Sequence, residues 1–234
     1  MTKIAAQIQA LGKTAKVWPL FLKQIKPGLT EKQVARLLWQ TLKQQGFTKK
    51  AFRFIVATGL SAAEPHHWPT NKKLAKSQAV KIDFGVTHRG WKTDVTRTVF
   101  LGKPTAQQKT LYQLVLKAQK QSAKLLKPGI PAQTIDKRAR SIIKRAGYGK
   151  YFIHGTGHGV GKRIHEPPWL TLTKKGLGKL KAGDVVTVEP GIYLPGRFGI
   201  RIEDMYLITK TGSRKLSSAI PSELTILTYA QPPT

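Results

Sequence analysis

The spacing of apolar residues predicts helices at the start of the chain and again in its middle. Residues 1–48 have the pattern of two amphipathic helices separated by Lys26-Pro27-Gly28, with Thr30 as the N-cap of the second. Ranges 105–126 and 132–146 also have helical periodicity and are parted by a Lys-Pro-Gly turn. Each of these segments is therefore predicted to bury one face.

The other patterned segments are short, apolar and bounded by turn residues, which favours strands. The expected strands lie at 52–57, within 79–101 on either side of a turn at 87–90, and at 184–194, 199–209 and 223–229. No stretch is low in complexity or linker-like. The chain is therefore predicted to be one domain over residues 1–234, without a separate N-terminal domain.

Two of the predicted hairpins carry acids where strands rarely hold them. Val-Lys-Ile-Asp83-Phe-Gly followed by Asp94 resembles Val-Thr-Val-Glu189-Pro-Gly followed by Glu203, so four of the eleven acids lie here. Symmetry about His88-Arg89 would make Asp83 face Asp94, and symmetry about Gly196 would make Glu189 face Glu203. A bulge would shift either register.

Facing like charges destabilise a sheet, so two such acid pairs require an explanation. A divalent cation removes the repulsion and satisfies the carboxylate oxygens, and facing carboxylates from two hairpins could hold two ions. The alternative is a solvated sheet face, with Lys81, Lys92 and Arg201 beside the acids. Because strands disfavour Asp, the sequence favours the metal site.

The histidines are a second group of candidate functional residues. Five of the six lie near turn sequences, and His154-Gly-Thr-Gly-His158 is the most specific stretch. Glycines on both sides of His158 allow the backbone to approach a ligand closely. A nucleotide-binding glycine motif is excluded, because no strand-helix unit surrounds this stretch. An isolated histidine is usually structural, but this cluster favours a metal or substrate role.

Composition changes the picture in two ways. The 234 residues include no cysteine and no long apolar run, and the N-terminus matches a signal peptide poorly. These features predict a cytoplasmic protein without a membrane span. The 41 Lys and Arg against 11 Asp and Glu give a formal charge of +30, which favours RNA or another polyanion as partner. A merely solvated basic surface is the alternative.

These motifs together resemble the pita-bread metallopeptidases, a family that contains methionine aminopeptidases, Xaa-Pro aminopeptidases and prolidases. The similarity extends from about Lys16 to Leu227. The matching motifs are Ile-Asp83-Phe-Gly, Thr-Asp94-Val-Thr-Arg-Thr, His154-Gly-Thr-Gly-His158, His165-Glu166-Pro, Val-Glu189-Pro-Gly-Ile-Tyr and Arg201-Ile-Glu203-Asp204. All five ligand types of the family occur in the family's order.

The resemblance implies an α+β pita-bread fold, in which two pseudo-two-fold halves form a curved antiparallel sheet flanked by helices. It implies that Asp94 and Glu203 bridge two divalent ions, that Asp83 completes one site, and that His158 and Glu189 complete the other. Such a carboxylate-rich site suits Mn²⁺, with Co²⁺ or Zn²⁺ as alternatives.

The resemblance also implies roles around the ions. A metal-bridging hydroxide would attack the scissile carbonyl with Glu189 as proton acceptor, while His66 and His165 bind substrate and intermediate. His154 would line the pocket for the residue after the cut, and Arg201 would orient a ligand carboxylate. His67 is the weaker alternative to His66.

Details favour the proline-directed branch of the family. Arg201-Ile-Glu203-Asp204 and Pro65-His66-His67 resemble Xaa-Pro peptidases, although Ser61 stands where Asn is common. The predicted function is therefore a Xaa-Pro aminopeptidase acting on peptides, as a monomer or homodimer. The alternatives are a methionine-type aminopeptidase, a prolidase, and a non-catalytic polyanion-binding module on the same fold. The choice between aminopeptidase and dipeptidase stays open at this point.

Overall fold

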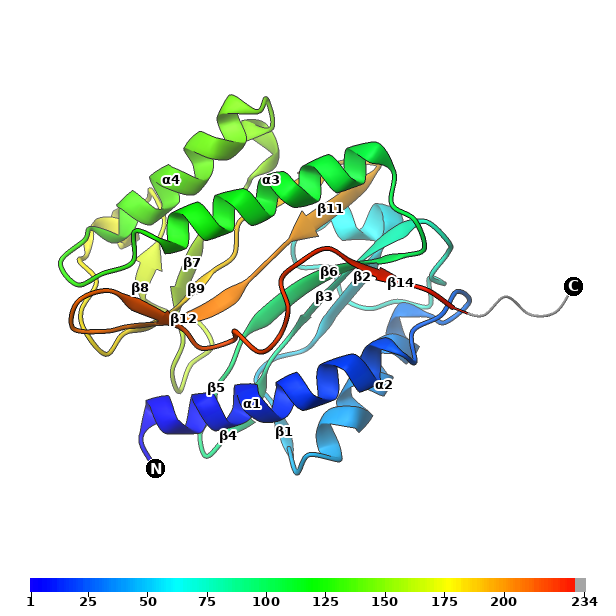
Figure 1. Cartoon of the computed structure of the whole chain (residues 1–234), viewed down its shortest axis with the longest axis horizontal. Helices are drawn as coiled ribbons and strands as arrows, with labels where there is room; N and C mark the ends of the chain where they lie inside the picture. The colour runs from blue at the N-terminus through cyan, green and yellow to red at the C-terminus, as the bar shows by residue number, and fades with distance from the viewer. Residues whose placement is uncertain (230–234) are drawn as a thin grey trace, which may run out of the picture.

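The computed structural model describes residues 1–229, and its helices lie on the outside of curved antiparallel sheets (Figure 1). The α-helices are α1 (Lys3–Leu22), α2 (Glu31–Lys43), α3 (Ala106–Ala123) and α4 (Ala132–Arg145). Short 3₁₀ helices occur at η1 (Gly59–Ala63), η2 (Gly149–Tyr151) and η3 (Lys174–Leu177). All four predicted helical segments are confirmed. Over the described residues, no helix is long and apolar enough to cross a membrane.

Threonine side chains cap the N-termini of α1, α2 and α3. The Thr30 hydroxyl accepts a hydrogen bond from the Gln33 amide at 3.1 Å, and the Gln33 side chain accepts one from the Thr30 amide at 2.7 Å. This capping box satisfies two amide groups that the first turn leaves free. Thr105 and Gln108 form the same arrangement at α3. The predicted N-cap at Thr30 is therefore confirmed.

Most strands belong to two sheets, and the remainder form a small three-stranded sheet, β1-β4-β5, and the hairpin β10-β11. The four-stranded sheet has the order β14-β6-β3-β2 and the five-stranded sheet the order β13-β12-β9-β7-β8. Only the β14–β6 pair is parallel among the described pairs. The bounds are β1 (Lys49–Lys50), β2 (Ile55–Thr58), β3 (Gln78–Phe84), β4 (Val86–His88), β5 (Trp91–Lys92), β6 (Val95–Leu101), β7 (Gly157–Gly159), β8 (Glu166–Leu170), β9 (Val185–Val188), β10 (Gly191–Leu194), β11 (Phe198–Arg201), β12 (Asp204–Ile208), β13 (Ser213–Lys215) and β14 (Thr225–Leu227).

Two groups of helices cover the sheets, one for each half of the molecule. In the first half, Trp18 and Phe21 of α1 and Leu38 of α2 are buried in the same core as strands β2, β3 and β6. In the second, α3 and α4 bury Leu111 and Ile143 against β10 and β11 (Figure 1). This arrangement is the predicted α+β pita-bread fold, which is confirmed. The inner ends of the two halves' strands meet at the centre.

The two acid-bearing hairpins differ in register. In the second, Gly191 pairs with Arg201 and Val188 with Asp204, so Glu189 and Glu203 are opposite each other, as predicted. In the first, Asp83 pairs with Thr96 rather than with Asp94, so the predicted register is wrong by two residues. The cause is the turn, which is centred one residue later than expected.

Both turn residues of the first hairpin adopt the left-handed conformation. The turn consists of Arg89 with φ of 51° and Gly90 with φ of 80°, and His88 pairs with Trp91 across it. Two successive positive φ values characterise the tight type I′ turn that matches strand twist. Asp94 therefore lies diagonally across from Asp83, still near enough to share a site.

Candidate metal centre

The five predicted metal ligands lie at the inner ends of strands from both halves. Asp83 belongs to β3, and Asp94 directly precedes β6. His158 is the middle residue of β7, Glu189 directly follows β9, and Glu203 directly precedes β12. All five line one cavity of about 210 Å³. The structure therefore brings together the complete set that the sequence singled out.

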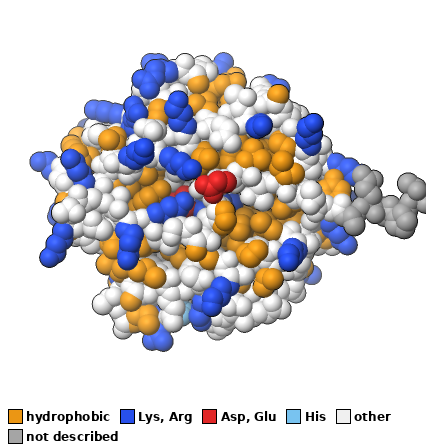
Figure 2. All heavy atoms as spheres, viewed as in Figure 1, with side chains coloured by type: hydrophobic (Ala, Val, Ile, Leu, Met, Phe, Trp, Pro, Cys, Tyr) orange, Lys and Arg blue, Asp and Glu red, His pale blue; other side chains and the backbone are white. Residues whose placement is uncertain are grey.

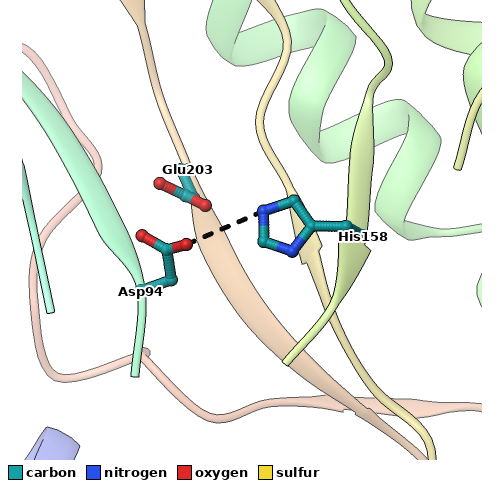
Figure 3. A group of neighbouring side chains, drawn as sticks. All are labelled: Asp94, His158 and Glu203. Atoms are coloured by element: carbon teal, nitrogen blue, oxygen red, sulfur yellow. Dashed lines mark ion pairs between the residues drawn. The ribbon is translucent and has the colours of Figure 1, made fainter. Parts of the chain in front are cut away.

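Three of these side chains point toward a common centre (Figure 3). One ligand atom from each of Asp94, His158 and Glu203 lies within 4.8 Å of the others, and all three residues are buried. His158 Nε2 is 3.7 Å from an Asp94 oxygen and 3.1 Å from a Glu189 oxygen. Such a group of an imidazole and carboxylates matches the donor set of first-row divalent ions.

The orientation of His158 is fixed by the backbone. Its Nδ1 lies 3.1 Å from the Gly159 carbonyl oxygen, so an Nδ1–H donates there and Nε2 is directed at the acids. A Cβ on Gly157 would lie 2.1 Å from the Thr187 carbonyl oxygen, so only glycine permits this approach of β7 to β9. The glycines around His158 are therefore required by strand packing.

Two buried carboxylate oxygens in the cavity have no hydrogen-bond partner among the described residues: Asp83 Oδ1 and Glu203 Oε1. The second oxygen of each is held in place, because Asp83 Oδ2 accepts from Arg201 and Glu203 Oε2 accepts from Thr96 at 2.7 Å. Unpaired buried acceptors are costly and rare. Divalent cations would satisfy them, so these residues fit the metal site that the family implies.

The electrostatics also indicate a site built for positive charge. Burial, reinforced by the charge of Glu203, raises the pKa of Asp94 well above its usual value, and burial with the charges of Glu189 and Asp83 raises the pKa of Glu203. Burial alone would raise the pKa of Glu189, but the hydrogen bond and charge of His158 lower it to about 2. The carboxylates therefore repel one another until a cation neutralises them.

We expect metal-free protein to gain stability from Glu203→Gln as the pH rises. The pKa of Glu203 is higher in the folded protein than its unfolded value of about 4.3. The contribution of protonated Glu203 to stability is therefore fully present below that unfolded pKa. It is lost as the pH rises through the pKa of the folded protein. Urea unfolding in chelator at several pH values should therefore show the wild type weakening relative to the variant above about pH 4. The control Glu223→Gln alters an exposed acid, and its difference should not grow there. A gap for Glu203→Gln that shrinks with pH would contradict the buried-charge account.

A hydrogen-bonded chain supports the cavity from one side. Arg201 donates to Asp83, to the Thr96 hydroxyl at 3.1 Å and to the Tyr193 hydroxyl at 3.0 Å. The Tyr193 hydroxyl in turn lies 2.8 Å from His154 Nε2. Arg201 is thus placed to orient a ligand carboxylate. Burial lowers the pKa of His154 to about 4, so this ring is neutral at pH 7.

The other histidines differ in whether they face the cavity. His66 and His165 line the cavity, and the His165 ring meets the His158 ring edge-on at 4.4 Å between centroids. Burial lowers the pKa of both, which favours neutral N–H donors. His67 is instead placed 2.8 Å from buried Glu31 and 3.1 Å from Glu64. The structure therefore gives His67 a structural contact and leaves His66 facing the cavity.

Several supporting residues were not singled out from the sequence. Thr96 holds Glu203, and Tyr193 links Arg201 to His154. Buried Arg97 donates to Asp204 at 2.6 Å, which shows Asp204 to be a structural partner outside the cavity. Buried Lys81 donates to the Ala62 carbonyl at 3.1 Å and so anchors the segment before His66. The sequence signal that could have identified these supporting residues is their polar character within otherwise apolar strands.

Comparison with known proteins agrees with this geometry. The model of metallopeptidase family M24 matches residues 6–210. A Xaa-Pro dipeptidase of Pyrococcus furiosus is 41% identical over 196 residues, which cover 84% of this chain and 56% of that protein. Among solved structures, a Xaa-Pro dipeptidase from Bacillus anthracis has a TM-score of 0.92 and 37% identity, with 96% of this chain and 62% of that one covered. An X-Pro aminopeptidase from Thermotoga maritima has a TM-score of 0.92 and 35% identity, with 96% and 63% covered.

The chain therefore belongs to metallopeptidase family M24. It spans 56% of the length of the curated dipeptidase that it matches. The sequence resemblance to the pita-bread metallopeptidases is thereby confirmed, and the Xaa-Pro branch is represented among the similar proteins. The division of the whole protein into domains stays a prediction.

Proposed function

We propose that this chain is a peptidase that uses two divalent metal ions to cleave the bond between an N-terminal residue and proline. The observation that carries the proposal is the convergence of five metal-binding side chains on one cavity, with two buried carboxylate oxygens left without partners. The names of the similar proteins, Xaa-Pro dipeptidases and an X-Pro aminopeptidase, support the choice of bond.

The metal ions would be held by Asp83, Asp94, His158, Glu189 and Glu203, which line one cavity. Four carboxylates and one imidazole suit Mn²⁺, with Co²⁺ or Zn²⁺ as alternatives. When bound, such ions supply Lewis acidity and lower the pKa of a water ligand. The cysteine-free composition fits a reducing compartment, and the cytoplasm is the proposed location.

The chain's own residues would handle protons and substrate. The hydrogen bond and charge of His158 lower the pKa of Glu189, so its carboxylate is ionised at neutral pH and would be the proton acceptor. Neutral His66 and His165 would donate hydrogen bonds to the scissile carbonyl and to the oxyanion that replaces it. Arg201 keeps Asp83 in position through a direct ion pair.

The experiment that tests this proposal compares dipeptides and metals. Purified protein that has been stripped with a chelator and reloaded with Mn²⁺ should hydrolyse Ala-Pro and other Xaa-Pro substrates, while Met-Ala is cleaved far more slowly. Preferential cleavage of Met-Ala would favour the methionine-type alternative instead. Hydrolysis that survives complete removal of metal would contradict the proposed chemistry.

A positively charged side chain in a second cavity favours dipeptides, which carry a free carboxylate, as substrates. This space of about 360 Å³ adjoins the first through His66, His158 and Glu189, and His154 and Lys175 also line it. The Lys175 ammonium lies 5.4 Å from the Trp169 ring centroid and has no ion-pair partner within residues 1–229. A free cation beside the site could bind a substrate carboxylate.

Comparing three substrates would decide between dipeptidase and aminopeptidase. If Lys175 binds the free carboxylate, Ala-Pro should be cleaved with a higher kcat/KM than Ala-Pro amide or Ala-Pro-Ala. Equal rates on all three would favour the aminopeptidase. A non-catalytic module is disfavoured in either case, because the complete set of metal-binding side chains converges on one cavity.

A further inference from the structure

The exposed surface is more basic than the formal charge of the chain indicates. Six of the eleven acids are buried, whereas only three of the 41 Lys and Arg residues are. Figure 2 shows one face, where Lys and Arg are spread widely and acids are scarce. Since the buried acids contribute little to the outer field, the solvent-facing surface is strongly positive.

A groove beside α2 combines cations with aromatic rings. Lys32, Arg36 and Trp39 are spaced four and three residues apart and so share one face of the helix, with Ala35 beside them. Together with Lys50, Arg53, Phe54 and Pro69 they line a groove of about 320 Å³, which we call the basic groove. None of its lining residues is acidic.

Two of these cations lie over aromatic rings. The Lys50 ammonium is 5.3 Å from the Trp39 ring centroid and 4.7 Å from that of Phe54. The Arg53 guanidinium is 4.5 Å from the ring centroid of Trp68, a side chain that is 51% exposed. Cation–π contacts hold these charges in place without neutralising them.

The positive charges of the basic groove are uncompensated. Within the described part of the chain, Lys32, Arg36, Lys50 and Arg53 have no carboxylate within 4.0 Å. Burial, with the charge of Arg53 in addition, lowers the pKa of Lys50. Gathering like charges without counter-charges is unfavourable, and an anionic ligand would relieve it.

We infer that the basic groove binds single-stranded nucleic acid. Four cations along an open groove, with no buried polar side chain among them, suit a chain of phosphates better than one small anion. Trp68 lines the neighbouring cavity rather than the groove itself, and its exposed indole, beside Arg53, offers a platform on which an unpaired base can stack. A duplex or an acidic peptide would leave that stacking surface unused.

The basic groove lies beside the cavity that holds the candidate metal ligands, because Arg53 lines both. Nucleic acid in the groove would therefore lie next to that cavity. This inference does not depend on the peptidase proposal, since nucleic-acid binding is measured directly on metal-loaded protein without any peptide.

The test compares two double variants that each remove two exposed positive charges. Lys32→Gln with Arg36→Gln alters the basic groove, and Lys117→Gln with Lys124→Gln is the matched control on the α3 side. Fluorescence anisotropy with a labelled single-stranded RNA of about 12 nucleotides, a usual site size, gives Kd over a range of salt. Thermal unfolding of each variant checks that its fold is retained.

The groove variant should bind on the order of tenfold more weakly at about 0.1 M salt, and its slope of log Kd against log salt should fall by about 1.4, for two lost phosphate contacts. The α3 variant should change much less. Equal weakening by both variants, or no binding at low salt, would overturn the inference. So would equally tight binding of the same RNA as a duplex, or displacement of the RNA by poly-glutamate as effectively as by unlabelled RNA.

Discussion

Replacing Glu203 with glutamine is expected to reduce hydrolysis of Ala-Pro by several orders of magnitude, because a neutral amide cannot replace a carboxylate as a ligand of the proposed cations. Glu203 is almost fully buried, and one of its oxygens has no protein partner. The amide nitrogen would present hydrogens where a cation is expected. The measurement is turnover after chelation and reloading with Mn²⁺, together with the metal content of the variant.

Glu223→Gln is the matched control, since it makes the same chemical change at an exposed acid paired with Lys120. It should retain wild-type turnover and metal content. Thermal unfolding provides a second readout: metal should raise the melting temperature of the wild type and of this control, and much less that of Glu203→Gln. Wild-type turnover in Glu203→Gln would remove this residue from the proposed metal site.

His165→Ala is expected to lower kcat by about 10²–10³ while the metal content stays unchanged. The half-buried ring lines the cavity and lies against His158, yet its lowered pKa keeps it neutral and able to donate to an oxyanion. The measurement is kcat on Ala-Pro with parallel metal analysis. Loss of metal instead would show that His165 acts by positioning His158.

His88→Ala is the control for a histidine outside the cavity, because His88 lies on β4 and contacts Gln9 at 2.7 Å. Its kcat should equal that of the wild type. An unchanged kcat in His165→Ala would exclude this residue from the chemistry.

The sequence predicted most elements of the fold but not the details of the strands. Helix faces and capping residues are local signals, so α1 to α4 were found with their order and approximate ends. Strands β7 and β8 were missed: β7 is Gly-His-Gly, and β8 contains Pro167 and Pro168, so neither has the alternation that marks a strand. Their pairing is determined by neighbouring strands that lie far away in the sequence.

For the candidate site, too, the sequence identified residues through local signals but could not give the long-range contacts between them. Acids in apolar hairpins marked Asp83 and Glu203 without any knowledge of the fold, but the first register depended on Arg89 accepting a positive φ. Nothing local signals that choice in a residue other than glycine, asparagine or aspartate. The resemblance ranked His66 above His67, but only the fold gives the physical reason, since His67 lies 2.8 Å from Glu31, a residue 36 positions earlier.

The proposed metal ligands come from both halves of the molecule, and this has a consequence for how the site forms. Asp83 and Asp94 lie on the first half's strands, whereas His158, Glu189 and Glu203 come from the second. During synthesis, the first hairpin is therefore complete long before its counterpart leaves the ribosome. If these residues bind the ions as proposed, the complete ligand set exists only after the chain has been made through Glu203, and metal loading would then be a late event that reports on the joining of the halves.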